Sequence, residues 1–560
     1  MKKTNRTFKR FAAITSASLL AACAVMPAVS SAANITITKG DASIPFASHT
    51  FEAYQIFKGD LDEKTNTLTN ITWGSNINSS VFINNLQFNA TDLGISSIAD
   101  GASAAAVAEV LADITAADNA KLLAKIVNDS LKPVDDAAPA TSSNGVIENL
   151  ATGYYFVKDA ENSGTDSGDA KTRFILKVTD DETVEIKTDA PSLVKKIKHN
   201  ETDEWGDVGD NQIGDTVEYY IATTVPDISD YDTYKYIIRD DMEAGLTYSG
   251  VTKIEYQPAT AGSTATTLWD GTGTPSNITI TAADDSSTVD FVEDFYINFD
   301  LKSLNLAAGG TIYTYYSAVL NGGAEVSSGA DDDKHNDNTA YLTYSNNPNQ
   351  SGSGNTHSTN DTEEDTVYDW TYTFDASKVD GSLADKPALA GAKFSLYEGD
   401  SETAMSLVSA GTAGGIDYYR IATADDADED KITVITTSTT EGRLATFRIL
   451  GLDDDQKYVI KEIATPSAEY NKCPDVVINK LTATYDTVGT DLTALTASIT
   501  QGTNENANAS NSVIIENNKG SVLPGTGGIG TTIFYLGGGA MAAIGGVYLI
   551  SKRRMKKSEE

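Results

Sequence analysis

Hydrophobic and polar residues alternate one by one through most of the chain. The segments Thr216–Ile221 (TVEYYI) and Thr311–Tyr316 (TIYTYY) are typical examples. Because neighbouring side chains of a strand point to opposite faces, this period of two predicts β-strands. Clusters of Gly, Asn, Asp and Ser lie between the segments and predict turns. The pattern therefore predicts an all-β protein.

One stretch departs from the alternation. Between Ala104 and Leu131, Ala and Leu are frequent and the apolar residues follow a helical spacing. This predicts one or two helices inserted into an otherwise β-rich first domain.

Composition changes at two places and predicts domain boundaries there. The first lies near Asp189–Pro191, and the second lies between Thr359 and Asp365, at the end of a polar linker rich in Gly, Ser and Asn. We expect tandem immunoglobulin-like β-sandwiches of the collagen-adhesin type, because each domain holds several short strands. Their predicted bounds are 34–189, 190–362 and 363–520.

The first 33 residues have the features of a secretory signal peptide. A basic start is followed by an apolar run from Phe11 to Pro27 and then by small residues, with cleavage expected after Ala32 or Ala33. Leu20–Cys23 resembles a lipobox, but we interpret Cys23 as a chance cysteine because a second anchor lies at the other end. Cleavage leaves Cys473 alone, so no internal disulfide is expected in this exported protein.

The C-terminal region, residues 521–560, has three parts. An apolar run from Ile529 to Ile550 is about long enough to span a membrane, and a basic tail follows it. A short motif precedes both and consists of Leu523, Pro524, Gly525, Thr526 and Gly527. Together they resemble the LPxTG sorting signal read by sortase transpeptidases. The resemblance implies cleavage between Thr526 and Gly527 and transfer of Thr526 to an amine.

Charge and residue usage exclude several classes of function. The net charge of −38 argues against nucleic acid and anionic lipid as partners. No metal or other cofactor is expected, because the histidines lack metal-ligand spacing and the acidic runs lack a calcium-loop pattern. We interpret the runs at Asp331–Asp333 and Asp425–Asp430 as solvated loops. The chain also has no nucleophile elbow, phosphate loop or zinc motif, so an enzyme is the least favoured class.

Strings in all three predicted domains resemble those of Gram-positive sortase-assembled backbone (major) pilins, which are isopeptide-forming fimbrial proteins. The strings are Tyr54–Asp60, Ile71–Gly74, Gly153–Val157, Gly214–Val217, Tyr236–Met242, Gly245–Tyr248, Leu389–Tyr397 and Tyr458–Pro466. The last two resemble a collagen-adhesin B-type repeat, and Tyr458–Pro466 resembles its E-box.

The resemblance implies a structural shaft subunit that is secreted, fixed to the cell wall and displayed on a surface pilus. Its implied partners are sortase, other copies of itself, minor pilins, peptidoglycan and a host surface. It also implies self-made isopeptide bonds, in which a lysine attacks an asparagine side chain and ammonia leaves. Such a lysine must be neutral, which burial favours, and a buried acid must relay protons.

In the third domain, alternation places Lys378 on the face of Tyr372, Phe374 and Ala376. Alternation also predicts that Glu462 and Asn517 lie on the inward faces of their strands. The resemblance assigns Lys378, Glu462 and Asn517 the roles of nucleophile, proton relay and amide.

In the middle domain, alternation favours Lys195 over Lys196 as the inward residue. The resemblance matches Asp240 to the family's catalytic aspartate, with Asp241 as the alternative. The asparagine expected on the last strand is Asn346, with Asn338 and Asn347 as alternatives. No comparable trio is evident in the first domain.

Polymerisation needs a lysine that accepts the next subunit. The YPKN-like motif of many backbone pilins is absent, and Lys187 occupies a similar place, so Lys187 is the candidate. The chief alternative to a pilin is an adhesin that is fixed singly to the wall and binds a host protein or glycan.

Overall fold

The computed structural model describes residues 33–520, apart from residues 40–48, 63, 66, 115, 165–168, 187–189, 283–292, 330, 331, 333, 351–357, 487, 488, 502, 503, 509 and 510. The chain divides into two compact units. The first comprises Met1–Glu325, Lys334–Trp370 and Thr487–Thr490, and the second comprises Val326–Asp333, Thr371–Asp486 and Asp491–Glu560.

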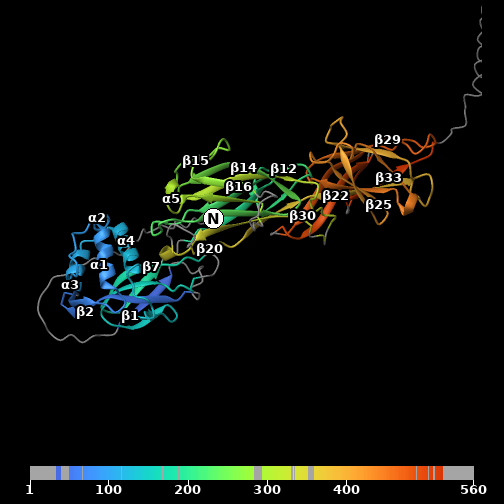
Figure 1. Ribbon diagram of the computed structural model, residues 1–560. Helices are drawn as coiled ribbons and strands as arrows, with labels where there is room; N and C mark the ends of the chain where they lie inside the picture. The colour runs from blue at the N-terminus through green and yellow to red at the C-terminus, as the bar shows by residue number, and fades with distance from the viewer. Residues whose placement is uncertain are drawn as a thin grey trace, which may run out of the picture. The chain divides into compact units, whose positions relative to one another are not determined.

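The first sandwich, residues 33–186, belongs to the first unit (Figure 1). Its smaller sheet has the order β5-β1-β8, formed by β1 (Ala33–Lys39), β5 (Val146–Leu150) and β8 (Glu182–Ile186). Its larger sheet has the order β3-β2-β6-β7 with β4 beside β2, formed by β2 (Phe51–Asp62), β3 (Thr67–Trp73), β4 (Ala140–Thr141), β6 (Gly153–Asp159) and β7 (Arg173–Val178). Ile35 and Ile147 of one sheet pack with Phe51 and Val157 of the other.

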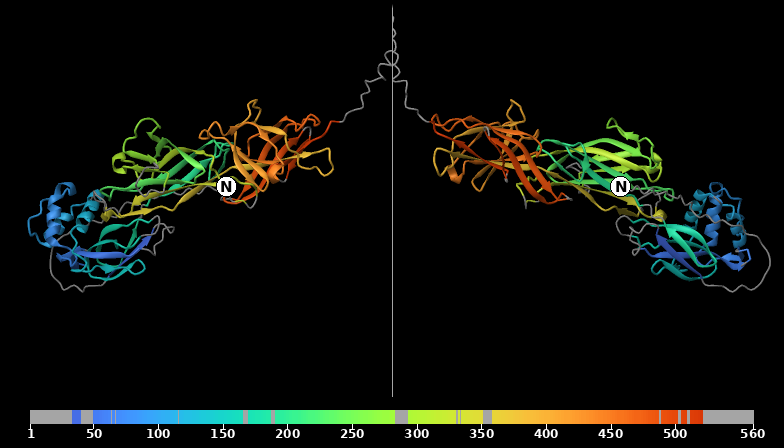
Figure 2. Two further views of the ribbon diagram at one scale, coloured as in Figure 1. Left: turned by 45° about the vertical axis from the view of Figure 1, so that its right-hand side comes forward. Right: turned by 180° about the vertical axis from the view of Figure 1, so that it is seen from behind.

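The helical insertion starts earlier in the chain than the sequence predicts. Its elements are α1 (Ser79–Phe88), α2 (Ala90–Leu93), α3 (Ala104–Leu111) and α4 (Ala117–Asn128). The Asn78 and Ser103 side chains cap α1 and α3 by accepting backbone hydrogen bonds. The helices gather beside the larger sheet in each view (Figures 1 and 2), where Phe82 and Val107 share a core with Phe57.

The middle sandwich, residues 193–370, also belongs to the first unit. One sheet has the order β10-β9-β12-β18-β14-β15, from β9 (Leu193–Lys198), β10 (Trp205–Gly206), β12 (Thr216–Thr224), β14 (Leu246–Gln257), β15 (Thr266–Trp269) and β18 (Thr311–Leu320). The other has the order β11-β21-β19-β13-β17-β16 with β20 beside β19, from β11 (Val208–Asp210), β13 (Tyr236–Met242), β16 (Ile278–Ala282), β17 (Phe295–Phe299), β19 (Asn336–Ser345), β20 (Thr359–Asp361) and β21 (Asp365–Trp370). The short helices α5 (Leu301–Leu304) and η1 (Pro348–Gln350) join strands.

The third sandwich, residues 372–517, belongs to the second unit. One sheet has the order β26-β24-β25-β28-β22-β33, from β22 (Tyr372–Asp380), β24 (Leu407–Ala413), β25 (Ile416–Ile421), β26 (Lys431–Ile432), β28 (Thr446–Leu452) and β33 (Ser512–Asn517). The other has the order β27-β23-β29-β30-β31-β32, from β23 (Lys393–Glu398), β27 (Ile435–Thr436), β29 (Tyr458–Ala464), β30 (Val476–Tyr485), β31 (Leu492–Gln501) and β32 (Asn504–Asn508). The turn η2 (Thr440–Gly442) precedes β28.

The predicted class is confirmed, since each of the three ranges forms two sheets of short strands. One assignment of strands differs from the sequence prediction. The sequence placed residues 363–370 in the third domain. In the structure, β21 instead belongs to the middle sandwich, where it pairs antiparallel with β19 and parallel with β11.

The prediction of a membrane-spanning segment is corrected. Within the described part of the chain, no helix is both long and apolar enough to cross a membrane. The apolar run between Ile529 and Ile550, on which that prediction rested, lies outside the described residues.

Candidate cross-linking sites

Lys195 lies in the core of the middle sandwich. On β9, Leu193, Lys195 and Ile197 face inward, and Lys195 is 0% exposed. The side chain of Lys196 is instead 25% exposed and pairs with Asp207 at the surface. A lysine is almost never fully buried without a partner, so Lys195 must have one.

The two hydrogen-bonding partners of the Lys195 side chain come from the facing sheet of the sandwich. Lys195 Nζ lies 2.5 Å from Asp240 Oδ2 on β13 and donates a hydrogen bond to Asn338 Oδ1 on β19. Tyr316 on β18 donates its hydroxyl proton to Asp240 Oδ2 at 2.8 Å and accepts a hydrogen bond from Asn338 Nδ2 at 3.2 Å. At most 1% of any of the four residues is exposed. The result is a polar network buried in the core.

Burial shifts both ionisable groups of this network toward their neutral forms. It lowers the pKa of Lys195 to about 8, although the nearby Asp240 carboxylate opposes the shift. Burial likewise raises the pKa of Asp240, although Lys195 opposes that shift. A neutral amine is a nucleophile and a protonated acid can donate a proton, so both shifts favour the protonation states that attack on an amide requires.

The structure brings Asn338 to Lys195, and it does not bring Asn346, the first choice from sequence. The two asparagines are separated by an even number of positions, so alternation places both on the same face and could not distinguish them. The register between β13 and β19 distinguishes them. Asp240 pairs with Ala340 and Met242 pairs with Asn338, so Asn338 lies beside Asp240 and Asn346 lies toward the other end of the strand. Asn346 lies beyond the far end of β19, where its Oδ1 accepts a hydrogen bond from Ser358 at 2.7 Å.

Asn347 and Asp241 also lie away from Lys195. Asn347 Oδ1 accepts a hydrogen bond from the backbone of Asn349 at 3.0 Å. Asp241 is exposed, because it follows Asp240 on the strand and faces the other side.

In the third sandwich the structure places Lys378, Glu462 and Asn517 in the core, with 1%, 0% and 0% of each exposed. Asn517 Nδ2 donates to Glu462 Oε2 at 2.9 Å and to the carbonyl of Asn471 at 2.6 Å. Lys378 Nζ donates to the carbonyls of Ile515 and Val379, at 3.0 and 3.3 Å. Burial lowers the pKa of Lys378, with Glu462 opposing the shift.

A cysteine that sequence reasoning left without a role also contacts this site. The backbone N–H of Cys473 donates to Glu462 Oε2 at 2.8 Å. Burial and then the adjacent Glu462 raise the pKa of the Cys473 thiol to about 12, so it stays protonated. Cys473 therefore helps to fix the acid and is not a reactive thiolate.

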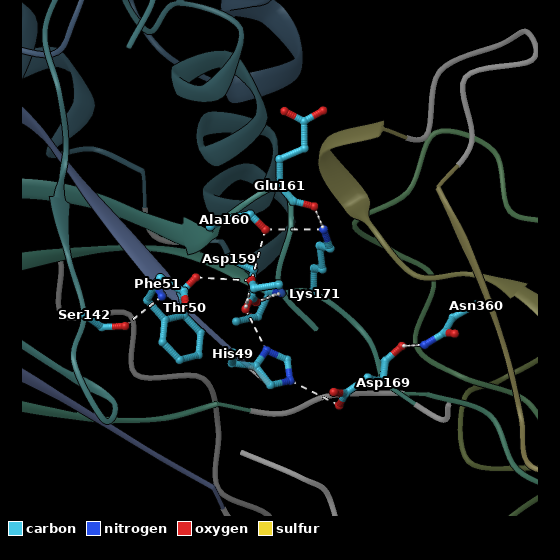
Figure 3. A network of polar contacts seen from close by, with 12 residues as sticks. His49, Thr50, Phe51, Ser142, Asp159, Ala160, Glu161, Asp169, Lys171 and Asn360 are labelled. Atoms are coloured by element: carbon cyan, nitrogen blue, oxygen red, sulfur yellow. Dashed lines mark hydrogen bonds and ion pairs between the residues drawn. The ribbon is translucent and has the colours of Figure 1, made fainter. Parts of the chain in front are cut away.

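The first sandwich buries a polar cluster that the sequence did not reveal. The His49 ring lies between two carboxylates, with Nδ1 at 2.6 Å from Asp159 Oδ1 and Nε2 at 3.1 Å from Asp169 Oδ1 (Figure 3). Asp159 Oδ2 also accepts the backbone N–H of Thr172 at 2.7 Å. Burial alone would lower the pKa of His49, but the hydrogen bonds and charges of Asp159 and Asp169 outweigh it and raise that pKa.

Residues of this cluster and its neighbours contact the middle sandwich. The carbonyl of Asp169 accepts a hydrogen bond from Asn360 Nδ2 at 3.3 Å (Figure 3) and another from the Tyr344 hydroxyl at 2.8 Å. The backbone N–H of Lys171 donates to the carbonyl of Asn346 at 2.7 Å. Asn346 thus belongs to a contact between the two sandwiches of the first unit.

Three sets of residues predicted from sequence cannot be placed. Outside the described residues lie the sorting motif Leu523–Gly527, the candidate acceptor Lys187 and residues 1–32 of the signal peptide.

Comparison with known proteins gives one family match. Residues 515–559 match the family model described as the LPXTG cell wall anchor motif. The chain carries a cell wall anchor. This wall-anchored protein is therefore secreted, and its motif is a signal for sortase processing and attachment to peptidoglycan. No curated protein matches the chain.

The wall-anchored protein is also similar to solved structures of major pilins. The T6 backbone pilin of serotype M6 Streptococcus pyogenes has 15% identity and a TM-score of 0.47, with 88% of this chain and 99% of that chain covered. The major pilin SpaD from Corynebacterium diphtheriae has 16% identity and a TM-score of 0.42, with 88% and 98% covered. BcpA, the major pilin subunit of Bacillus cereus, has 13% identity and a TM-score of 0.38, with 87% and 99% covered.

Proposed function

We propose that this wall-anchored protein is the backbone (major) pilin of a sortase-assembled pilus, a structural subunit of a covalently polymerised shaft. One observation carries the proposal: two successive β-sandwiches each bury a lysine, an acid and an asparagine in the core. Taking such charged groups out of water costs several kcal/mol per ion before their attraction offsets it. Two such trios in one exported chain favour chemistry over packing.

Each trio has the groups for one intramolecular isopeptide bond. The neutral lysine Nζ attacks Cγ of the asparagine, a bond between Nζ and Cγ forms, and the bond from Cγ to Nδ2 breaks. Counted from the neutral amine and the protonated acid, the acid gives one proton to the leaving nitrogen and takes one from Nζ, so ammonia leaves and the acid is regenerated. In the middle-sandwich trio Lys195 contacts Asn338, and holding the groups in contact makes the attack effectively unimolecular.

The products would be Lys195–Asn338 and Lys378–Asn517 cross-links, each formed once, so the protein is not a turnover enzyme. Asp240 and Glu462 act as the proton relays. In the exported chain Cys473 has no second cysteine to pair with once the signal peptide is removed. Isopeptide bonds would therefore supply the covalent stabilisation that disulfides give to many other extracellular proteins.

Polymerisation would use the two ends of the exported chain. Sortase would cleave after Thr526 and join it to a lysine of the next copy, for which Lys187 is the candidate, or finally to peptidoglycan. Minor pilins and a host surface would be further partners of the assembled shaft.

A denaturing gel of wall extracts tests this function. A pilin gives a ladder of high-molecular-weight species that resists boiling, and Lys187→Ala collapses the ladder if Lys187 is the acceptor. Thr526→Ala is the control that blocks all sortase transfer. A single band from the unmutated protein would instead indicate a singly anchored adhesin.

A further inference from the structure

Tyr316 occupies a particular place in the middle-sandwich trio. Its hydroxyl lies between the acid and the amide nitrogen, at 2.8 Å from Asp240 Oδ2 and 3.2 Å from Asn338 Nδ2. In the described part of the chain, no hydrogen bond joins Asp240 to Asn338 directly. The acid is thus connected to the nitrogen that must leave only through the tyrosine hydroxyl.

The position of the Tyr316 ring is fixed by its packing. The ring stacks on Tyr219 with centroids 5.2 Å apart and meets Phe295 edge-on at 5.0 Å. Lys195 Nζ lies 5.6 Å from the centre of the Tyr316 ring. Tyr316 is 1% exposed, so no bulk water competes for its hydroxyl. Burial and the adjacent Asp240 raise the pKa of Tyr316 well above its usual value, so the hydroxyl keeps its proton between transfers.

We propose that Tyr316 is a catalytic residue of the middle-sandwich cross-link, passing the proton of Asp240 to the leaving nitrogen of Asn338. This inference rests on the proposed isopeptide chemistry and adds a residue to it. As the bond from Cγ to Nδ2 breaks, the Tyr316 hydroxyl gives its proton to Nδ2, and Asp240 gives its proton to Tyr316. Asp240 regains a proton from Lys195 Nζ across their 2.5 Å contact. Atoms balance, because Nζ loses one proton and Nδ2 gains one on leaving as ammonia.

A hydroxyl suits this step because it is donor and acceptor at once. Tyr316 donates to Asp240 and accepts from Asn338 before the reaction, and rotation of its O–H bond reverses the direction. Phenylalanine would keep the ring and lose the relay.

The third sandwich provides the contrast. There the acid has one more methylene group, and Asn517 Nδ2 donates to Glu462 Oε2 directly at 2.9 Å. No intermediate hydroxyl is needed at that site. The third-sandwich bond is therefore an internal reference within the same molecule.

The test compares Tyr316→Phe with the unmutated full chain after cell-free synthesis. Samples are digested at intervals, and the Lys195–Asn338 and Lys378–Asn517 cross-linked peptides are measured by mass spectrometry. We expect Tyr316→Phe to slow the first cross-link by about 10²- to 10⁴-fold, the usual contribution of a positioned proton donor. The second cross-link should form at its normal rate.

Tyr236→Phe is the matched control. Tyr236 is also fully buried in the middle sandwich, and its hydroxyl donates to the carbonyl of Thr224 at 2.9 Å, outside the trio. Both cross-links should form at the unmutated rate in this variant. Lys195→Ala gives the thermal unfolding profile of a folded middle sandwich without the bond, and Tyr316→Phe should match it.

The possible outcomes distinguish the relay role of Tyr316 from the isopeptide chemistry itself. An unchanged rate for the Lys195–Asn338 cross-link in Tyr316→Phe overturns the role of Tyr316 and leaves the isopeptide chemistry intact. Absence of that cross-link from the unmutated chain overturns the proposed chemistry of the middle sandwich itself. A Tyr316→Phe protein less stable than Lys195→Ala would show that the hydroxyl acts through the fold, which also refutes the relay.

Discussion

Lys195 and Asn338 meet across the two sheets of the middle sandwich, although 143 positions separate them in the chain. Lys195 comes from β9 of one sheet, and Asn338 comes from β19 of the other. In the third sandwich, Lys378 and Asn517 lie on neighbouring parallel strands of one sheet, with Asp380 paired to Asn517. A bond at the first site would fasten sheet to sheet, and a bond at the second would fasten strand to strand.

The mass of the folded exported chain should fall by roughly 17 Da for each cross-link, because each one expels ammonia. We expect two losses in the unmutated protein. Asn338→Ala should abolish one of them, since the structure places Asn338 against Lys195. Asn346→Ala is the matched control and should retain both losses. Loss of a bond in Asn346→Ala, with both retained in Asn338→Ala, would refute the pairing.

Glu462→Ala should remove the third-sandwich cross-link and leave that sandwich folded but less stable. The bond would close a loop of about 140 residues, worth about 5 kcal/mol in the chain-entropy description. Denaturant unfolding and intact mass together check this. Glu516→Ala is the control, because Glu516 pairs with Lys386 at the surface, at 2.6 Å, and should keep the bond. A cross-link that persists in Glu462→Ala would exclude Glu462 as the relay.

The first sandwich should lose stability at alkaline pH. The folded-state pKa of His49 is raised above its ordinary value of 6.5. Its contribution is therefore fully present below about pH 6.5 and is lost as pH rises through the folded pKa. His49→Gln should be less stable near pH 6 and should flatten this dependence, as measured by thermal unfolding between pH 5 and 9. Greater stability of the unmutated sandwich at pH 9 than at pH 6 would contradict the arrangement.

Alternation along a strand predicts which residues share a face, and most of the candidate cross-linking residues could be chosen on this basis. It separated Lys195 from Lys196 correctly in terms of burial, since only Lys195 is fully buried. It could not choose between Asn338 and Asn346, because residues an even number of positions apart share a face. That choice depends on the register between β13 and β19, which is set by packing at long range.

Three other structural features could not be predicted from the sequence, because they also depend on contacts at long range or have no local pattern. The strand β21 follows a polar linker, so its pairing with β19 in the middle sandwich has no local signal. The helix α1 lies before the Ala-rich stretch, and it exposes the apolar Val81 and Phe88, so its apolar residues do not mark one buried face. His49 and Asp159 are 110 positions apart in the chain, so no local pattern could have linked them to each other or to Asp169.

The last prediction concerns force applied between Lys187 and Thr526, the ends through which a shaft subunit would be pulled. The two cross-links would exclude the loops between Lys195 and Asn338 and between Lys378 and Asn517 from extension. Each loop would otherwise release about 500 Å of chain. Apart from the short segments next to Lys187 and Thr526, the residues under load outside both loops are the roughly 40 between Asn338 and Lys378. They include β20 and β21 and can release at most about 140 Å. Single-molecule pulling should therefore show one short step or none in the unmutated protein.

Lys195→Ala and Lys378→Ala should each restore one long step. Lys196→Ala, which changes a partly exposed neighbour, is the control and should restore neither. Long steps from the unmutated protein would defeat this account of how the shaft bears tension, even if the subunits polymerise.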